Sequence, residues 1–243
     1  MAYQTTDACG RLWETKLSTN DSTPVDGAEK LRAIRILGDG RAFRYMRMTG
    51  SAGALGNIYM SATKVAVTDA TGASGKGPDG ATTTIITDSD AAYTTNDYIN
   101  WYFKVSTSKT GSEEAIKVVG NSATTLTLEK SIGTALAVGG TDDGEILAGT
   151  AAGILSTTSE LDIPIVGIGI GALTQDYYGW VQVRGIGNVI STSALSEGAA
   201  FSSGGTTTAG QAADRVGADD NYLGICIAAG GTDDYQMVDI RIA

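Results

Sequence analysis

The segment from residue 31 to residue 48 reads Leu-Arg-Ala-Ile-Arg-Ile-Leu-Gly-Asp-Gly-Arg-Ala-Phe-Arg-Tyr-Met-Arg-Met. Apolar residues at short spacing on both sides of Gly38-Asp39-Gly40 predict two antiparallel strands joined by a glycine-rich turn. On the second strand, alternation places Arg41, Phe43, Tyr45 and Arg47 on one face and Ala42, Arg44, Met46 and Met48 on the other. Both faces mix apolar and basic residues, so the sequence leaves open which one points inward.

The same β pattern continues through most of the chain, with glycine and Asx-Gly turns between the runs. Further strands are predicted at residues 57–60, 64–68, 98–105, 114–119, 124–129, 163–170, 178–185, 222–227 and 236–242. The last two runs predict a closing hairpin. Residues 71–81 predict a loop, and only residues 209–216 suggest a short helix.

The expected fold class is therefore all-β, an antiparallel β-sandwich or barrel body with an inserted small β module. Residues 1–81 would form the N-terminal part of the body, which carries the basic hairpin. Residues 82–147 would form the inserted module, and residues 148–243 the C-terminal part of the body.

Composition excludes much enzyme chemistry. The 243 residues include 33 Gly and no His, so Ser-His-Asp triads, Cys-His pairs and imidazole zinc sites are ruled out. The formal net charge of -10 makes the chain as a whole a poor ligand for a nucleic-acid backbone. We expect no enzymatic activity and no cofactor.

Export and membrane insertion are not predicted. Residues 1–7 lack both the basic start and the apolar run of a secretory signal, and no apolar stretch is long enough to span a bilayer. Cys9 and Cys226 lie near opposite ends and make no disulfide framework, so we expect two free, buried thiols.

Two glycine-rich stretches resemble cofactor motifs only superficially. Residues 167–171 have the wrong spacing for a dinucleotide fingerprint and are followed by no helix pattern, so their glycines are expected to permit close backbone approach or bulges. In residues 72–77 the first glycine is at the wrong distance for a phosphate loop, and no Ser or Thr follows Lys76. A plain loop is therefore the favoured interpretation.

Acidic clusters leave two further alternatives open. They are Asp88-Ser89-Asp90, Asp142-Asp143-Gly144-Glu145, Asp219-Asp220-Asn221 and Asp233-Asp234. Their oxygens could bind calcium, but none matches an EF-hand loop, and acidic turns are common for conformational reasons alone. Paired carboxylates also serve glycoside hydrolysis, although nothing else in the sequence resembles a catalytic arrangement. We therefore predict no metal site and no catalytic residue.

Positive charge is concentrated near the N-terminus. Residues 1–64 hold nine bases and six acids, whereas residues 65–243 hold eight bases and twenty-one acids. The basic run from Lys30 to Arg47 fits a solvated strand pair, a docking surface for an acidic partner, or, less well, a nucleic-acid site. The residues assigned to contact with a partner are Arg35, Arg41, Phe43, Arg44, Tyr45 and Arg47.

Three stretches resemble a known family. Tyr178-Gly179-Trp180-Val181-Gln182-Val183-Arg184-Gly185 is similar to the Trp-Val-Gln-x-Arg-Gly strand of tailed-bacteriophage virion structural proteins, among them capsid decoration, or cement, proteins. Residues 38–45 look like the early Gly-Arg-x-Phe-Arg-Tyr hairpin of such proteins. Residues 96–129 resemble their inserted β module.

The resemblance implies a non-enzymatic protein that binds the outer surface of the phage head and stabilises the capsid lattice. Its partners would be the major capsid protein and further copies of itself, as a homotrimer, with no direct contact to nucleic acid or membrane. It would be made in the host cytoplasm and reside on the outer capsid surface of the virion. Charge reversal at Arg41 and Arg44 is expected to lower capsid occupancy and leave the fold intact.

A second hypothesis comes from a different class of protein. A tail or surface-projecting adhesin could use Tyr98, Trp101 and Tyr102 of the inserted module to stack on a host sugar. Such aromatics are more often core residues than ligand platforms. Binding to glycans together with a tail location would favour this alternative.

Overall fold

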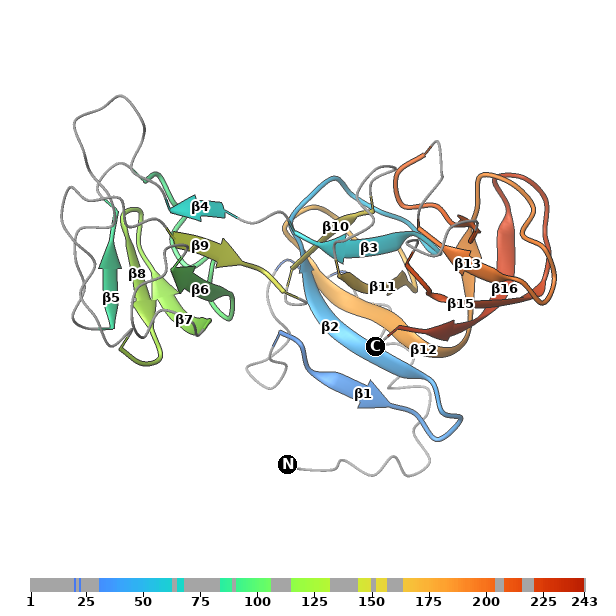
Figure 1. Cartoon of the computed structure of the whole chain (residues 1–243), viewed down its shortest axis with the longest axis horizontal. Helices are drawn as coiled ribbons and strands as arrows, with labels where there is room; N and C mark the ends of the chain where they lie inside the picture. Colours follow the sequence, from blue (N-terminus) through green and yellow to red (C-terminus); the bar gives the residue numbers. More distant parts are fainter. Residues whose placement is uncertain are drawn as a thin grey trace. The chain divides into compact units, whose positions relative to one another are not determined.

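The computed structural model describes residues 20, 22, 31–62, 65–67, 84–88, 91–105, 115–131, 144–149, 152–156, 164–203, 208–215 and 221–242. Within these ranges every regular element is a β-strand, and nearly all strand pairs are antiparallel (Figure 1). The all-β prediction is therefore confirmed. The chain divides into two compact units: residues 1–61 with 150–243, and residues 62–149.

The first unit contains one ten-stranded sheet in the order β1-β2-β10-β3-β11-β12-β16-β15-β13-β14. Its strands are β1 (Ile34–Ile36), β2 (Ala42–Met48), β3 (Ile58–Ser61), β10 (Ala152–Leu155), β11 (Ile165–Gly169), β12 (Tyr178–Ile190), β13 (Ala200–Ser202), β14 (Ala213–Asp214), β15 (Gly224–Ala228) and β16 (Tyr235–Arg241). Because β12 also pairs with β2, the strands β2, β10, β3, β11 and β12 close into a ring. The body is thus a small five-stranded barrel with further strands attached.

The barrel interior is filled by Met46, Met48, Tyr59, Val166 and Val181, all at most 1% exposed, together with the nearly buried Leu173. A ring of five strands leaves little room for side chains. Gly167 illustrates how closely the strands pack. A Cβ atom at Gly167 would lie 2.5 Å from Cγ2 of Val181. Close backbone approach therefore explains this glycine, as the sequence analysis predicted.

A second core lies against the other side of the barrel strands. Ile58 and Met60 of β3 and Ile168 of β11 pack there with apolar side chains from the strands β12 to β16 and their connections. The 13-residue strand β12 joins the two regions, because its first half pairs with β2 and its second half with β16. The hairpin predicted between β15 and β16 is present.

The second unit holds a six-stranded sheet in the order β4-β9-β6-β7-β8-β5. Its strands are β4 (Val65–Val67), β5 (Ile85–Thr87), β6 (Tyr102–Val105), β7 (Ile116–Asn121), β8 (Thr125–Leu128) and β9 (Gly144–Leu147). Buried Val67, Phe103, Val118 and Ile146 contribute to its interior. The unit spans residues 62–149, wider than the predicted module at 82–147, because β4 pairs with β9.

Two secondary-structure predictions differ from the structure. The strand predicted at residues 98–105 begins only at Tyr102, because residues 95–100 form turns and Asn100 has a φ of +70°. Residues 209–215 contain no helix; they form a turn at Gly210, which has a φ of +80°, and then the strand β14 paired with β13. The positive φ and the strand pairing prevent a continuous helical turn there. The loop predicted at 71–81 lies outside the described residues.

Candidate interaction surface

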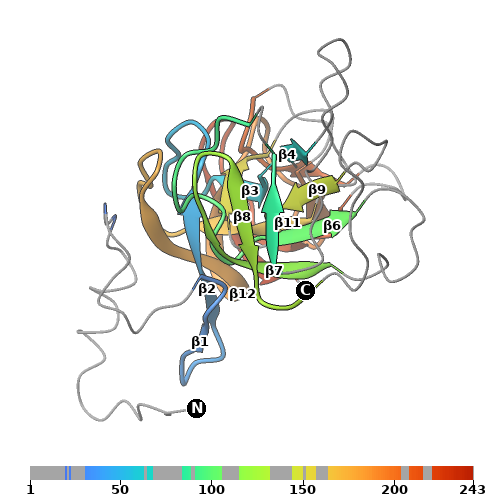
Figure 2. The same cartoon turned by 90° about the vertical axis from the view of Figure 1, so that its left-hand side faces the viewer.

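The basic segment forms the predicted hairpin. Ile34 pairs with Arg44 and Ile36 with Ala42 in antiparallel register, and the turn includes Gly40 with a φ of +87°. Leu37 N donates to Arg41 O at 2.8 Å, which closes the hairpin beside the turn. Figure 2 shows β1 lying beside β2 at the margin of the first unit.

The strand β2 is buried on both faces. Its inner face points into the barrel, where Arg44 is 9% exposed and its Nη1 donates to Val166 O at 2.9 Å. Burial, with the positive charge of Arg32 nearby, lowers the pKa of the Arg44 guanidinium from its usual value. Arg44 therefore has a structural role, because its guanidinium lies inside the barrel and not on the surface.

On the outer face of β2, Phe43 and Tyr45 form an aromatic cluster with Trp180 of the neighbouring strand β12. The guanidinium carbon of Arg35 lies 4.5 Å from the centre of the Trp180 ring, which is within the range of a cation–π contact. Arg47 pairs with Asp176 at 3.1 Å. Arg35 thus lies over a buried ring, and Arg47 is held in an ion pair.

These contacts correct the assignment of partner-binding residues. Phe43, Tyr45 and Arg44 are 2%, 1% and 9% exposed, so their side chains offer almost no surface to a partner. The reason is that β2 separates the barrel interior from the aromatic cluster. Of the six residues assigned, only Arg35, Arg41 and Arg47 retain partial exposure, and charge reversal at Arg44 is not expected to spare the fold.

The structure gives a role to Gln182 and Gly185 in the strand motif that carries the family resemblance. A bulge occurs in β12 opposite β2 between Gln182 and Arg184, and Gly185 follows with a φ of +88°. Nε2 of Gln182 donates to three successive carbonyls, those of Arg184, Gly185 and Ile186, at 3.0, 3.2 and 2.9 Å. Gln182 therefore holds the bend at which β12 passes from β2 to β16.

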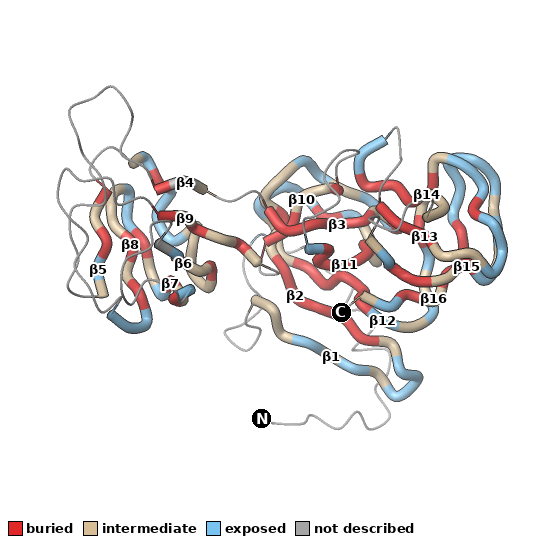
Figure 3. The backbone as a smooth tube through the Cα atoms, viewed as in Figure 1, coloured by how far each residue is buried: buried red, intermediate tan, exposed pale blue. Residues whose placement is uncertain are grey.

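The strand β1 differs from β2 in its exposure. It stands at one end of the ten-stranded sheet, and its Ile34 and Ile36 side chains are 49% and 73% exposed. Figure 3 shows the contrast between the exposed hairpin margin and the buried β2. Exposed isoleucines on an edge strand are uncommon in soluble proteins, because such edges promote association.

A hollow of about 310 Å³, lined by both apolar and polar residues, lies beside the hairpin. It is lined by Arg41, Leu55, Gly169, Ile170, Gln182, Ile186, Gly187, Asn188 and Met237. Leu55, Ile186 and Met237 are among the exposed large apolar side chains of the described residues. Sequence reasoning missed this hollow, because its walls come from segments distant in the chain.

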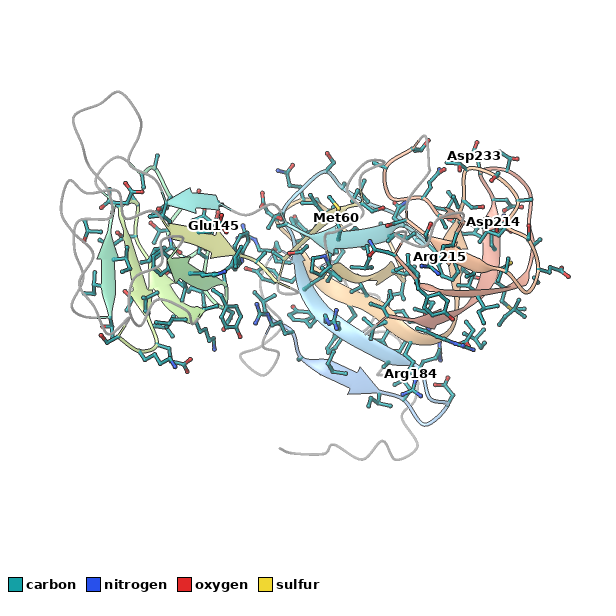
Figure 4. All side chains as sticks on the ribbon, in the orientation of Figure 1. Met60, Glu145, Arg184, Asp214, Arg215 and Asp233 are labelled. Carbon is teal, nitrogen blue, oxygen red and sulfur yellow. The ribbon has the colours of Figure 1, made fainter. Side chains whose placement is uncertain are left out.

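Charged side chains of both signs lie on the first unit, and Arg215 lies beside Asp214 at the end formed by β13 to β16 (Figure 4). Arg184, labelled in Figure 4, lies near the β1–β2 hairpin, in register with Ala42. Asp214 and Asp233 lie at the end formed by β13 to β16 in the same figure. The part of the chain described here contains no group of three side chains suited to a metal ion, and residues 89–90, 142–143 and 219–220 of the acidic clusters lie outside it.

The aromatic residues of the second unit form a compact cluster. Tyr98 makes edge-to-face contacts with Tyr93 and Trp101, at ring distances of 5.3 and 5.2 Å. Trp101 is only 4% exposed and Tyr93 is 9% exposed. Trp101 is therefore a core residue, and its ring is not available to stack on a sugar.

Cys226 is buried and forms no disulfide, while Cys9 lies outside the described residues. Among the residues that the structure describes, no helix is long and apolar enough to cross a membrane. No family model, no curated protein and no solved structure matches this chain.

Proposed function

We propose that this chain is a non-enzymatic virion structural protein of a tailed bacteriophage that binds the outer surface of the head and stabilises the capsid lattice. The observation that carries the proposal is the exposed pair Ile34 and Ile36 on the edge strand of an arginine-rich hairpin. An apolar edge of this kind is typical of a surface that becomes covered in an assembly. The resemblance of the β12 motif to decoration proteins supports the same function.

The architecture suits such a role. The barrel interior is tightly packed, and Gln182 bonds three carbonyls at the bend of β12. Both features make the body rigid, which suits a protein that reinforces a shell. Each copy would contribute a modest contact to the major capsid protein, and many identical contacts add up through multivalency. The proposal includes self-association as a homotrimer, no cofactor, and residence on the outer capsid surface.

The adhesin hypothesis gains no specific support from the structure. It required an exposed aromatic platform in the second unit, and Trp101 is buried there. The remaining aromatic residues of that platform, Tyr98 and Tyr102, are half-buried. The structure does not favour a second function on this basis.

The test uses the purified full chain and undecorated heads of the virus that encodes it. We expect saturable co-sedimentation with the heads, density on the outer shell in a particle reconstruction, and a higher temperature of DNA release. Density confined to the tail, or heads that neither bind the chain nor gain heat resistance, would contradict the proposal.

A further inference from the structure

We propose that β1 accepts an acidic, extended segment of the shell protein as an added strand at the edge of the ten-stranded sheet. This inference rests on the proposed function and names the chemistry of its contact. The occupant is a β-strand that carries carboxylate side chains. The surface is the outer edge of β1 together with the arginines of the hairpin.

The backbone of β1 points its spare hydrogen-bonding groups outward. Tyr45 N donates to Ala33 O at 2.9 Å, and Leu37 N donates to Arg41 O at 2.8 Å, so the odd-numbered residues bond β2. Successive residues of a strand direct their backbone groups to opposite sides. The N–H and C=O groups of Ile34 and Ile36 therefore face away from β2, toward the side where the described sheet ends.

The side chains of the same two residues are the most apolar part of the exposed hairpin. Ile34 and Ile36 lie on one face of β1, whereas Arg35 between them turns to the other face and covers Trp180. An added strand would bond the outward backbone groups, and its own side chains would lie beside both isoleucines on the same face. Edge strands of soluble proteins usually carry charges or prolines at such positions, and β1 has neither there.

The positive charge of the hairpin favours an acidic partner. Residues 31–48 contain five arginines and one acid, whereas the whole chain has a formal net charge of -10. The positive charge of this region comes from the hairpin's own residues, which makes it a basic segment on an acidic protein. An acidic strand is attracted to this region and repelled by the remaining surface.

A nucleic acid fits this surface less well than an acidic protein segment. Sequence-tolerant binding of single strands depends on aromatic rings that stack on bases. The rings of Phe43, Tyr45 and Trp180 are at most 4% exposed. The exposed groups are isoleucines on a strand edge, which match the backbone and side chains of another β-strand.

The contact is short, which fits a repetitive lattice. A three-residue strand offers few backbone hydrogen bonds, and each contributes only about 1 kcal/mol net. Binding at one site is therefore weak. Copies joined in the proposed trimer would bind several shell segments at once, so a short edge is sufficient there.

The experiment compares two substitutions at Ile36 for binding of the full chain to undecorated heads. Ile36→Pro removes the outward N–H and leaves the Leu37 N–H, which bonds β2, in place. Ile36→Thr keeps the outward N–H and removes most of the apolar surface. Strand addition predicts that the proline variant loses about fivefold or more in affinity and the threonine variant clearly less.

A second measurement does not depend on substitution. Hydrogen exchange of the wild-type chain is followed with and without heads. Strand addition predicts that the amides of Ile34 and Ile36 gain protection on binding, whereas the Leu37 amide is protected in both states. Thermal unfolding of both variants checks that the hairpin still folds.

The outcomes separate this inference from the proposed function. Wild-type chain that fails to bind heads contradicts the function itself. Wild-type binding with equal losses for the two variants, or with no new protection at Ile34 and Ile36, overturns strand addition while the function stands. Binding to a 20-nucleotide oligothymidylate that protects the same amides would overturn the choice of an acidic protein segment. Affinity for heads should fall as salt is raised, because the attraction is between exposed charges.

Discussion

The two strands of the basic hairpin contain similar proportions of arginine, but they differ in which side chains are buried. In β2, Arg44 enters the barrel and bonds a backbone carbonyl, and the rings of its neighbours Phe43 and Tyr45 are buried. In β1, Ile34 and Ile36 face solvent and Arg35 covers an aromatic ring. A cluster of positive charge in the sequence therefore contains both core and surface, and only the tertiary position of each strand separates them.

The largest effect is expected at Arg44. Arg44→Glu places a buried carboxylate beside Val166 O, where the guanidinium had donated a hydrogen bond. Leaving an uncompensated charge in the barrel should destabilise the fold by about 3–5 kcal/mol. Urea unfolding followed by far-UV circular dichroism measures the change.

Arg41→Glu is the matched control. Arg41 pairs with Asp39 and its side chain is 35% exposed, so reversal there should cost no more than about 1 kcal/mol. Equal losses of stability for the two reversals would remove the distinction between an inward and an outward arginine.

The next largest effect concerns the bend of β12 that supports the hairpin. Gly185 has a φ of +88°, and a Cβ atom there would lie 3.1 Å from Cα of Arg41. Gly185→Ala should therefore lower the free energy of unfolding by about 1–3 kcal/mol. Gly38→Ala in the hairpin turn meets nothing within 4 Å and serves as the control, with a change expected within about 0.5 kcal/mol. A Gly185→Ala protein as stable as its control would show that the bend tolerates a side chain.

A smaller effect is expected where β1 covers the aromatic cluster. Arg35→Ala removes the guanidinium from its position 4.5 Å above Trp180. The expected loss is about 0.5–1 kcal/mol, measured by urea unfolding. Arg35→Lys keeps a cation near the ring and should lose less than the alanine variant. If Arg35→Ala unfolds at the same urea concentration as wild type, the contact does not stabilise the fold.

Local patterns in the sequence predicted the fold class and the hairpin. In the turn at residues 38–40, Gly40 stands where a positive φ is needed, and alternation of β-branched and aromatic residues identifies strands. Short strands such as β9, β10 and β13 escaped prediction, because their few residues make no periodic pattern. The strand β4 falls within residues 1–81, the predicted N-terminal part of the body, and its place in the second unit follows only from its pairing with β9.

The candidate surface was predicted only in part. The sequence identified the basic hairpin but assigned contact to Phe43, Arg44 and Tyr45, which are buried. Both faces of β2 mix apolar and basic residues, and no local rule states that a strand has a core on each side. The exposure of Ile34 and Ile36 depends on β1 extending past the closed barrel, and closure depends on the pairing of β2 with β12.

The smallest effect on stability is expected at β1 itself. Ile34→Thr exchanges an exposed, β-branched side chain for a polar one of the same branching, so the free energy of unfolding should change by no more than about 0.5 kcal/mol. The same substitution at the fully buried Ile58 of β3 should cost about 2 kcal/mol or more, since it buries a hydroxyl and leaves space. Light scattering should show less self-association for Ile34→Thr than for wild type, because an apolar edge promotes association. Equal losses at Ile34 and Ile58 in urea unfolding would mean that β1 is as much a core strand as β3, and the contrast between the two strands of the hairpin would no longer hold.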